Sequence, residues 1–256
     1  MSAPVPSPPT SAAIPQEFSH VPAIPPPVKV ELLVLPEHEC TYLPAREARF
    51  RAVQAGRIDP ELYHDFMDAG FRRSGRMLYQ PICRRCRRCV QIRVPVATFA
   101  MSKSQRRVWR RNQDLLVTVG RAVPSQEKFL LYRRYLLHRH DGKQDDSPAA
   151  FESFLYDSPT RTIEFEYRLR TGKLIAAGIC DIARRSLSSV YFFFDPAESR
   201  RSPGIFGVLQ EIDFARQQAI PYVYLGYWVE GAQTMDYKAQ FRPLQLLGGD
   251  GAWRDR

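Results

Sequence analysis

The chain has 256 residues, with 37 Lys plus Arg against 27 Asp plus Glu, for a formal net charge of +10. Apolar residues make up 44% and charged residues 25%, which is typical of a globular domain and argues against wholesale disorder or a fibrous class. No apolar stretch approaches the roughly 20 residues that span a bilayer, and no basic start precedes an apolar run, so we expect neither an integral membrane protein nor a secretory leader.

The amino-terminal segment has a different composition from the rest of the chain. Residues 1–27 contain nine Pro with Ser and Ala between them, a composition that predicts a disordered or polyproline-like tail. We divide the remainder into a basic, Cys-containing domain over 28–120 and a second domain over 121–256. An odd number of Cys, five, without an export signal favours a reducing compartment and hence a cytoplasmic location.

Apolar periodicity and capping residues predict the elements in chain order, and their sequence indicates an α+β protein with a mixed sheet. Helices are expected at Pro60–Ala69, Ser102–Asn112, Ser125–His140, Ala149–Leu155, Gly204–Gln218 and, for a turn or two, Met235–Gln240. Strands are expected at Val30–Val34, Met77–Tyr79, Val90–Val94, Leu115–Val119, Thr162–Arg170, Lys173–Ile182, Ser188–Phe194 and Tyr222–Tyr227.

The positive charge is concentrated in one stretch. Residues 71–121 carry fourteen Lys or Arg and one acid, Asp114. Such focusing is what binding to a phosphate backbone requires, whereas a solubilising excess would be spread along the chain. Five of these cations lie on the predicted Ser102–Asn112 helix: Lys103, Arg106, Arg107, Arg110 and Arg111. We therefore expect this helix to contact a nucleic acid.

Three cysteines recur at two-residue spacing in the same stretch. Cys83, Cys86 and Cys89 are separated by pairs of Arg, and Cys40 is the one plausible fourth ligand upstream, because Cys180 lies in a predicted core strand. Four thiolates suit zinc, but three close cysteines with a remote fourth are more typical of iron–sulfur ligation. The neighbouring Arg side chains are expected to lower the pKa of the thiols. A reduced, metal-free loop is the remaining alternative.

Several motifs occur together and in order, and they carry a resemblance to a known family. They are Cys40–Pro44 (CTYLP), Gly70–Gly75 (GFRRSG), the three spaced cysteines, Ser102–Arg107 (SKSQRR), Arg139–Gly142 (RHDG), Tyr191–Pro196 (YFFFDP), Tyr224–Trp228 (YLGYW) and Met235–Lys238 (MDYK) before Phe241–Pro243. Over about residues 35–253 the chain resembles the bacterial aspartate/glutamate leucyltransferases, which are aminoacyl-tRNA–protein transferases related to arginyltransferases. It departs from the pattern at Pro203, where Leu is usual.

The resemblance implies a carboxy-terminal domain similar to the GNAT acyltransferase fold. It implies transfer of leucine from leucyl-tRNA to proteins that begin with Asp or Glu, which marks them for N-degron proteolysis. The transfer itself needs no cofactor, although related enzymes carry an iron–sulfur cluster on amino-terminal cysteines, so Cys40, Cys83, Cys86 and Cys89 are candidate metal ligands.

The reaction assigns expected roles to individual residues. For the acceptor's carboxylate the candidates are Arg72, Arg73, Arg139 and Lys238, and for the leucyl group Tyr224, Tyr227 and Trp228. Backbone amides near Gly204 are expected to hold the 3′ end of the tRNA or the oxyanion. His140 and Asp195 are the candidates for proton transfer.

Three rival functions remain open at this point. The donor could be arginyl-tRNA rather than leucyl-tRNA, because only the resemblance favours leucine. An acetyl-CoA-dependent GNAT acetyltransferase would share the fold but would leave the focused positive charge unexplained. A non-catalytic RNA-binding protein with a metal ribbon is the third.

Overall fold

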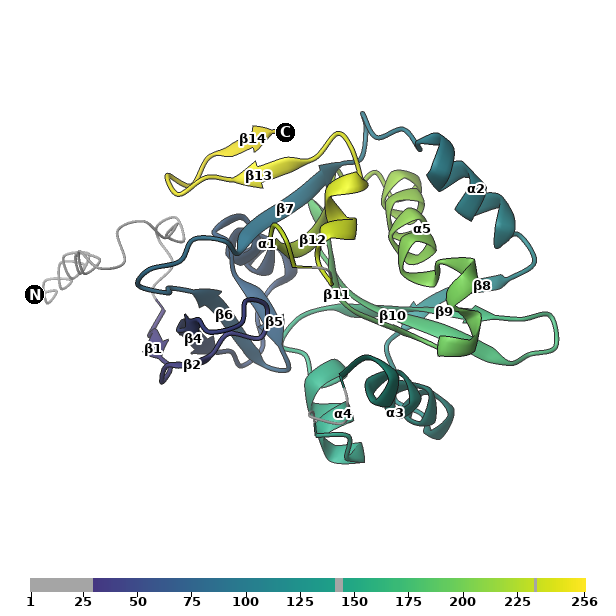
Figure 1. Cartoon of the computed structure of the whole chain (residues 1–256), viewed down its shortest axis with the longest axis horizontal. Coiled ribbons are helices and arrows are strands. Elements are labelled where there is room, and N and C mark those ends of the chain that lie inside the picture. Colours follow the sequence, from purple (N-terminus) through teal and green to yellow (C-terminus); the bar gives the residue numbers. More distant parts are fainter. Residues whose placement is uncertain (1–29, 141–144, 233) are drawn as a thin grey trace, which may run out of the picture.

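The computed structural model describes residues 30–140, 145–232 and 234–256, in which helices pack against a larger and a smaller sheet, and a further pair of strands lies apart (Figure 1). The proline-rich tail expected over 1–27 and the Asp141-Gly142 pair lie outside the described residues. The helices are α1 (Pro60–Asp68), α2 (Lys103–Arg111), α3 (Gln126–His140), α4 (Pro148–Leu155) and α5 (Pro203–Gln217), with the 3-10 segments η2 (Pro196–Arg201) and η3 (Asp236–Gln240).

Local capping explains why the first two helices begin where the sequence predicts. The Asp59 side chain accepts from the amide of Glu61 at 2.8 Å at the start of α1. At α2, Ser102 and Gln105 form a reciprocal capping box, in which each side chain satisfies the backbone amide of the other. Both helices are therefore fixed by contacts within four residues.

The smaller sheet packs on α1. Its order is β1-β4-β6-β5. These strands are β1 (Leu33–Val34), β4 (Phe50–Gln54), β5 (Arg72–Ser74) and β6 (Met77–Pro81), and a separate pair joins β2 (His38–Glu39) to β3 (Glu47–Ala48). Tyr63, Phe66 and Leu78 bury the contact between α1 and this sheet. The strand expected over Val30–Val34 is shorter, because only its last two residues pair.

The larger sheet has the order β14-β13-β7-β12-β11-β10-β9-β8. Its strands are β7 (Val90–Pro95), β8 (Leu116–Arg121), β9 (Thr162–Arg168), β10 (Leu174–Ile182), β11 (Ser186–Phe194), β12 (Tyr222–Trp228), β13 (Gln245–Leu247) and β14 (Trp253–Asp255). β11 and β12 pair in parallel, while the other neighbours pair antiparallel. The expected α+β class with a mixed sheet is confirmed.

The larger sheet also draws on the amino-terminal half of the chain. β7 precedes the division that we expected between residues 120 and 121, and β8 reaches only one residue beyond it, yet β7 pairs with β12 and β8 with β9. α2 lies beside α5. The larger sheet therefore contains strands from both sides of that expected division.

Helices cover both faces of the larger sheet. α2 and α5 lie over one face, and α3 and α4 over the other (Figure 1). Phe206, Leu209 and Ile212 on α5 are buried against one face, whereas Tyr132 and Leu136 on α3 are buried against the other. This arrangement places the beginning of α5 and the end of α3 on opposite faces of the sheet.

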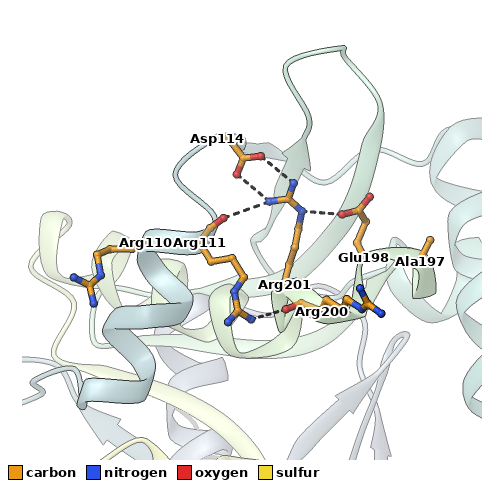
Figure 2. Close-up of a pocket in the computed structure, with 7 residues that line it drawn as sticks. All are labelled: Arg110, Arg111, Asp114, Ala197, Glu198, Arg200 and Arg201. Atoms are coloured by element: carbon orange, nitrogen blue, oxygen red, sulfur yellow. Dashed lines mark hydrogen bonds and ion pairs between the residues drawn. The ribbon is translucent and has the colours of Figure 1, made fainter.

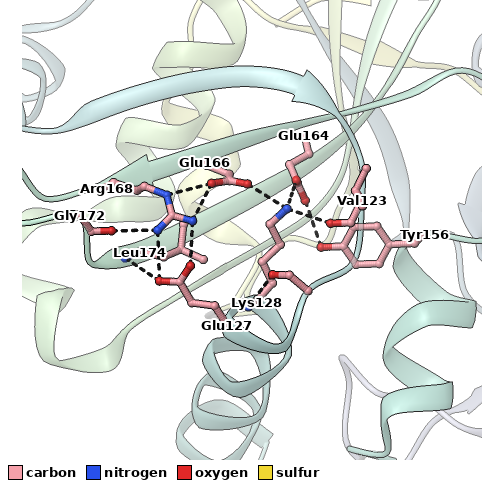
Figure 3. Close-up of polar contacts among 10 residues, drawn as sticks. Val123, Glu127, Lys128, Tyr156, Glu164, Glu166, Arg168, Gly172 and Leu174 are labelled. Atoms are coloured by element: carbon pink, nitrogen blue, oxygen red, sulfur yellow. Dashed lines mark hydrogen bonds and ion pairs between the residues drawn. The ribbon is translucent and has the colours of Figure 1, made fainter.

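A buried ionic network fixes α3 on its face of the sheet (Figure 3). The ammonium of Lys128 contacts the carboxylate of Glu164, lies 2.9 Å from an oxygen of Glu166 and donates to the Val123 carbonyl at 2.8 Å. The hydroxyl of Tyr156, at the end of α4, donates to Glu164 at 3.0 Å. The network joins α3, α4 and β9 and leaves each buried charge paired, which is the condition for burying charges.

Within the part of the chain that the structure describes, no helix is long and apolar enough to cross a membrane.

Candidate active site

The parallel pairing of β11 with β12 stops partway along both strands. Ser186–Ser188 pair with Tyr222–Tyr224, after which the remainder of β11 pairs only with β10 and that of β12 only with β7. Arg72, from β5, lies at this point: its guanidinium donates to Ser188 Oγ at 2.8 Å and to the carbonyl of Ser189. Arg72 therefore occupies the place where the two strands part.

Gly226 makes room for Arg72 on the β12 side. The φ angle of Gly226 is +78°, and a Cβ atom there would lie 2.9 Å from Nε of Arg72. Both the left-handed backbone and the close approach of the guanidinium require glycine. The glycine of the Leu-Gly-Tyr-Trp motif is thus required by Arg72, a residue that is distant in sequence.

A buried carboxylate on α5 faces the same region. Glu211 is 1% exposed; its Oε1 accepts from Ser189 Oγ at 3.0 Å and from Cys180 Sγ at 3.3 Å. Its Oε2 has no partner among the described residues. Burial raises the pKa of Glu211 to about 7, against the opposing effects of its hydrogen bonds and of nearby Arg72 and Lys238.

Lys238, on η3, brings a cation to this carboxylate. Its Nζ donates to the Tyr227 carbonyl at 2.9 Å. Burial, together with the positive charge of Arg72, lowers the pKa of Lys238 to about 7, although Glu211 acts in the opposite direction. An ammonium carries three protons, so two donors remain after the carbonyl is satisfied.

Arg139 approaches from the other face of the sheet, at the end of α3. It is exposed, and its charge acts on Tyr237, which is 37% exposed and next to Lys238 in the chain. Burial and the charge of Glu211 raise the pKa of Tyr237. The structure thus places Arg72 and Lys238 near Glu211, and Arg139 near Tyr237, the neighbour of Lys238 in the chain.

Arg73, the fourth predicted cation, is enclosed. Its Nε lies 2.6 Å from Asp181 Oδ2, and both side chains are fully shielded from solvent. Thr162 Oγ1 donates to the other oxygen of Asp181 at 2.6 Å. This geometry gives Arg73 a structural role in joining β5 to β10, and its expected contact with substrate stays a prediction that the geometry does not favour.

The three aromatic residues expected to bind leucine are buried rather than arranged around an open pocket. The Tyr224 hydroxyl contacts Asp68, and the Tyr227 hydroxyl donates to the carbonyl of Gly70 at 2.7 Å. Trp228 is 8% exposed. Tyr224 and Tyr227 join the larger sheet to the α1 region, so a role in leucyl binding stays a prediction without support from their exposure.

The two candidates for proton transfer differ in what the structure says of them. Asp195 is 2% exposed, caps η2, and pairs with Lys173 at 2.8 Å and Arg134 at 3.0 Å. Although burial acts to raise it, these partners hold the pKa of Asp195 below its usual value, which makes it a weak base. The side chain of His140 lies outside the described residues.

The basic helix presents its charges to solvent. Lys103, Arg106, Arg107, Arg110 and Arg111 are all exposed, whereas Gln105 is buried and Trp109 packs against Phe206 of α5 with ring centroids 5.6 Å apart. A pocket of about 800 Å³ follows at the end of α2 (Figure 2), lined by Arg110, Arg111, Asp114, Ala197, Glu198, Arg200 and Arg201.

Arg201 joins η2 to the segment that follows α2. Arg201 makes a bidentate pair with Asp114, at 2.9 Å for both contacts, and pairs with Glu198 at 2.7 Å. The Arg111 side chain donates to the Arg200 carbonyl. Beyond η2, α5 begins at Pro203 after Ser202, whose φ is +56° and whose side chain does not cap the helix. Gly204 next to it adjoins open space.

The four cysteines lie near one another without forming a ligand group. Cys40, Cys83, Cys86 and Cys89 are each partly buried, and burial and the other three thiols raise the pKa of Cys89 to about 12. The expected lowering by arginines is thus not found at Cys89, because the Arg side chains of the loop are exposed. Among the described residues, no three His, Cys, Asp or Glu side chains are placed to hold a metal ion.

Comparison with known proteins assigns the chain to a family. Residues 38–107 match the amino-terminal and residues 127–248 the carboxy-terminal model of the arginine-tRNA-protein transferases. An aspartate/glutamate leucyltransferase from Hahella chejuensis is 40% identical over 218 residues, covering 84% of this chain and 93% of the relative. The chain belongs to this family of transferases. A Stenotrophomonas maltophilia aspartate/glutamate leucyltransferase is 42% identical over 232 residues, covering 86% and 90%.

The fold of this leucyltransferase-family protein also matches a solved structure. FemX superposes with a TM-score of 0.50 at 10% identity, covering 75% of this chain and 67% of FemX. At that identity the match concerns the fold alone. The match confirms the expected GNAT-like arrangement of the mixed sheet. The family match shows separately that the protein is a transferase, as the sequence predicted.

Sequence reasoning did not single out Glu211, whose buried carboxylate lies near Arg72 and Lys238. The signal was present, because Val208, Glu211 and Ala215 recur at helical spacing on the side of α5 that faces the sheet, where all three are buried. An acidic residue on an apolar helix face is rarely left buried without a function or a partner.

Proposed function

We propose that this protein transfers the leucyl group of leucyl-tRNA to the α-amine of proteins that begin with Asp or Glu, marking them in the cytoplasm for N-degron proteolysis. The observation that carries the proposal is the position of α5 between two charged regions. Its beginning adjoins the exposed cations of α2, and its buried Glu211 faces Lys238 and Arg72. One helix thus links a surface for a polyanion to a compact site for a charged amino acid.

The chemistry needs little beyond positioning. The neutral α-amine, whose pKa is about 8, attacks the ester carbonyl carbon of the leucyl group. A C–N bond forms, the bond to the ribose oxygen breaks, and that oxygen takes up a proton. Because the ester is already activated, holding the two substrates in register supplies much of the acceleration. No step uses a metal, and the iron–sulfur or zinc ligation expected at the cysteines stays a prediction to which the described geometry gives no support.

The tRNA is assigned to α2 and the pocket at its end. Phosphates attract exposed Lys and Arg side chains, and Arg fits them through a two-pronged donor. The beginning of α5 adds backbone amides and the positive end of a helix dipole near Gly204. We assign the 3′ end of the tRNA to this stretch.

The acceptor is assigned to the cations near Glu211 and the adjoining Tyr237. An amino-terminal Asp or Glu presents a carboxylate, for which Lys238 and Arg139 are the candidates. The guanidinium of Arg72 is held by β11, so it contributes its charge to the site from a fixed position.

Removing charge from α2 tests the tRNA assignment. We expect the triple variant K103A/R106A/R107A to raise KM for leucyl-tRNA about 10-fold, and to reduce the slope of log KM against log salt by about 2, because each lost phosphate contact removes about 0.7–0.9 from it. KM for the acceptor peptide should not change. The control R57A/R161A/R184A removes the same charge from exposed positions outside α2; if it shifts the slope equally, α2 is not the tRNA surface.

The transfer assay tests the proposal as a whole. We expect radiolabelled leucine to move from leucyl-tRNA to peptides that begin with Asp or Glu, and not to a peptide that begins with Arg. Arginine transfer from arginyl-tRNA would establish the rival donor. Tight acetyl-CoA binding with indifference to tRNA would establish the acetyltransferase. Binding of tRNA without any transfer would leave a non-catalytic RNA-binding protein.

A further inference from the structure

We propose that Glu211 binds the α-ammonium group of the acceptor protein before that group loses its proton and reacts as the neutral amine, and that it does so through the carboxylate oxygen for which the described structure provides no partner. The inference rests on the proposed function, and it adds a binding residue that neither the family match nor the sequence motifs assign.

The first argument is the incomplete hydrogen bonding of this carboxylate. Ser189 and Cys180 both donate to Oε1, while Oε2 is buried and has no donor among the described residues. A buried acceptor without a donor is costly, so such groups persist where a ligand or water completes them. The Tyr167 hydroxyl, whose pKa is raised by burial and by the charge of Glu211, is a second buried group without a partner. Two unpartnered polar groups in the same region indicate a site for a polar ligand.

The second argument is access. Glu211 itself is covered, but Ser189, Lys238 and Tyr237 beside it are partly exposed. Ser189 follows the last residue of β11 that pairs with β12, so among the described residues these two strands share no ladder pairing at this level. A chain terminus can therefore reach the carboxylate by displacing side chains rather than backbone.

The third argument is charge complementarity with one substrate. An amino-terminal Asp carries an ammonium and a carboxylate only a few bonds apart. The site offers an anion, Glu211, beside the cation Lys238, with Arg72 near both. The leucyl group of the donor also has an ammonium, but its side chain is apolar and would leave these cations unmatched. The arrangement therefore favours the acceptor over the donor.

The groups that face Glu211 set the direction of its pH dependence. They are Cys180 on β10, Ser189 on β11, Tyr167 on β9, Arg72 on β5, and Tyr237 and Lys238 on η3. Burial dominates over the cations and raises the pKa of Glu211 to about 7. Ammonium binding needs the ionised carboxylate, so it should be lost as the pH falls through about 7.

The test compares an Asp-initiated peptide with its desamino analogue, in which the α-amine is replaced by hydrogen. Dissociation constants are measured by titration calorimetry on the full chain with saturating uncharged tRNA, which cannot react. At pH 7.5 we expect the wild type to bind the amine peptide about 10-fold more tightly, the ratio that one charge-assisted hydrogen bond provides. In E211Q this ratio should approach 1, while binding of the desamino peptide should not change.

The matched control is D213N, two residues further along α5, where the carboxylate accepts only from Gln217 within the described structure. D213N should retain the wild-type ratio. An unchanged ratio in E211Q, or equal weakening of both peptides, overturns the inference. Should E211Q not fold, the wild type decides alone: its ratio should fall between pH 7.5 and 5.5, where the amine stays charged, and a constant ratio overturns the inference. Leucine transfer by the wild type, measured on the same peptide, shows separately whether the proposed function holds.

Discussion

The variant R73A is expected to lose about 3–5 kcal/mol of unfolding free energy, measured by urea denaturation followed by circular dichroism. The Nε of Arg73 lies 2.6 Å from Asp181, and neither side chain is exposed. Removing the guanidinium leaves a buried carboxylate with only the hydroxyl of Thr162 as a donor among the described residues. Because a domain has about 5–15 kcal/mol in total, a loss of this size is a large share of its stability.

An exposed ion pair from the same segment supplies the control. Arg76 lies 2.9 Å from Asp157, but the side chains are 37% and 50% exposed, so R76A should cost no more than about 1 kcal/mol. The double variant R73L/D181L, which removes both charges, should recover much of the loss. Equal effects of R73A and R76A would contradict the structural role given to Arg73 and return it to the candidates for substrate binding.

The parts of the fold that could be predicted from the sequence are those fixed by short-range contacts. α1 and α2 begin after the capping residues Asp59 and Ser102. The Thr171-Gly172 pair forms the turn between β9 and β10, and Gly172 there has a φ of +90°. Partnership between distant strands leaves no such local signal. β7 looks the same in sequence whether it pairs with its neighbours in the chain or, as here, with β12 and β13.

The site shows the same division. Arg72 and Lys238 could be predicted, because they lie in motifs that the resemblance identifies, and the structure brings both to Glu211. Arg73, adjacent in the same motif, turns to Asp181 instead, since successive side chains of a strand point to opposite faces. Motif membership thus does not distinguish a residue that faces substrate from one that holds the motif in place.

The burial of Tyr224 and Tyr227 has a similar cause. An aromatic-rich strand suits a ligand pocket or a contact between two sheets equally well, and sequence does not reveal that the α1 region packs against β12. The hydroxyls end on Asp68 and Gly70, so these rings serve the contact between the two parts.

Replacing Lys238 by Met tests how the site recognises an acidic acceptor. We expect K238M to lower kcat/KM for an Asp-initiated peptide about 100-fold, the value of roughly 3 kcal/mol for a charge-assisted contact, while KM for leucyl-tRNA changes less than twofold. The hydrogen bond from Nζ to the Tyr227 carbonyl is also lost, so the effect on folding is measured separately by thermal unfolding. Because the loss should lie in carboxylate recognition, K238M should retain whatever small activity the wild type has on an Asn-initiated peptide.

The lowered pKa of Lys238 gives this prediction a second, independent readout. With a pKa of about 7, the ammonium loses its proton as the pH rises above 7, so KM of the wild type for the Asp-initiated peptide should increase from pH 7 to 9. The guanidinium of K238R stays charged over that range. The KM of K238R should therefore change less between pH 7 and 9 than the wild-type KM, even if the longer side chain fits less well. A wild-type KM that is constant from pH 7 to 9, together with an unaltered preference for Asp over Asn in K238M, would place the acceptor's carboxylate on Arg139 instead, since Arg139 is an exposed cation whose charge acts on Tyr237.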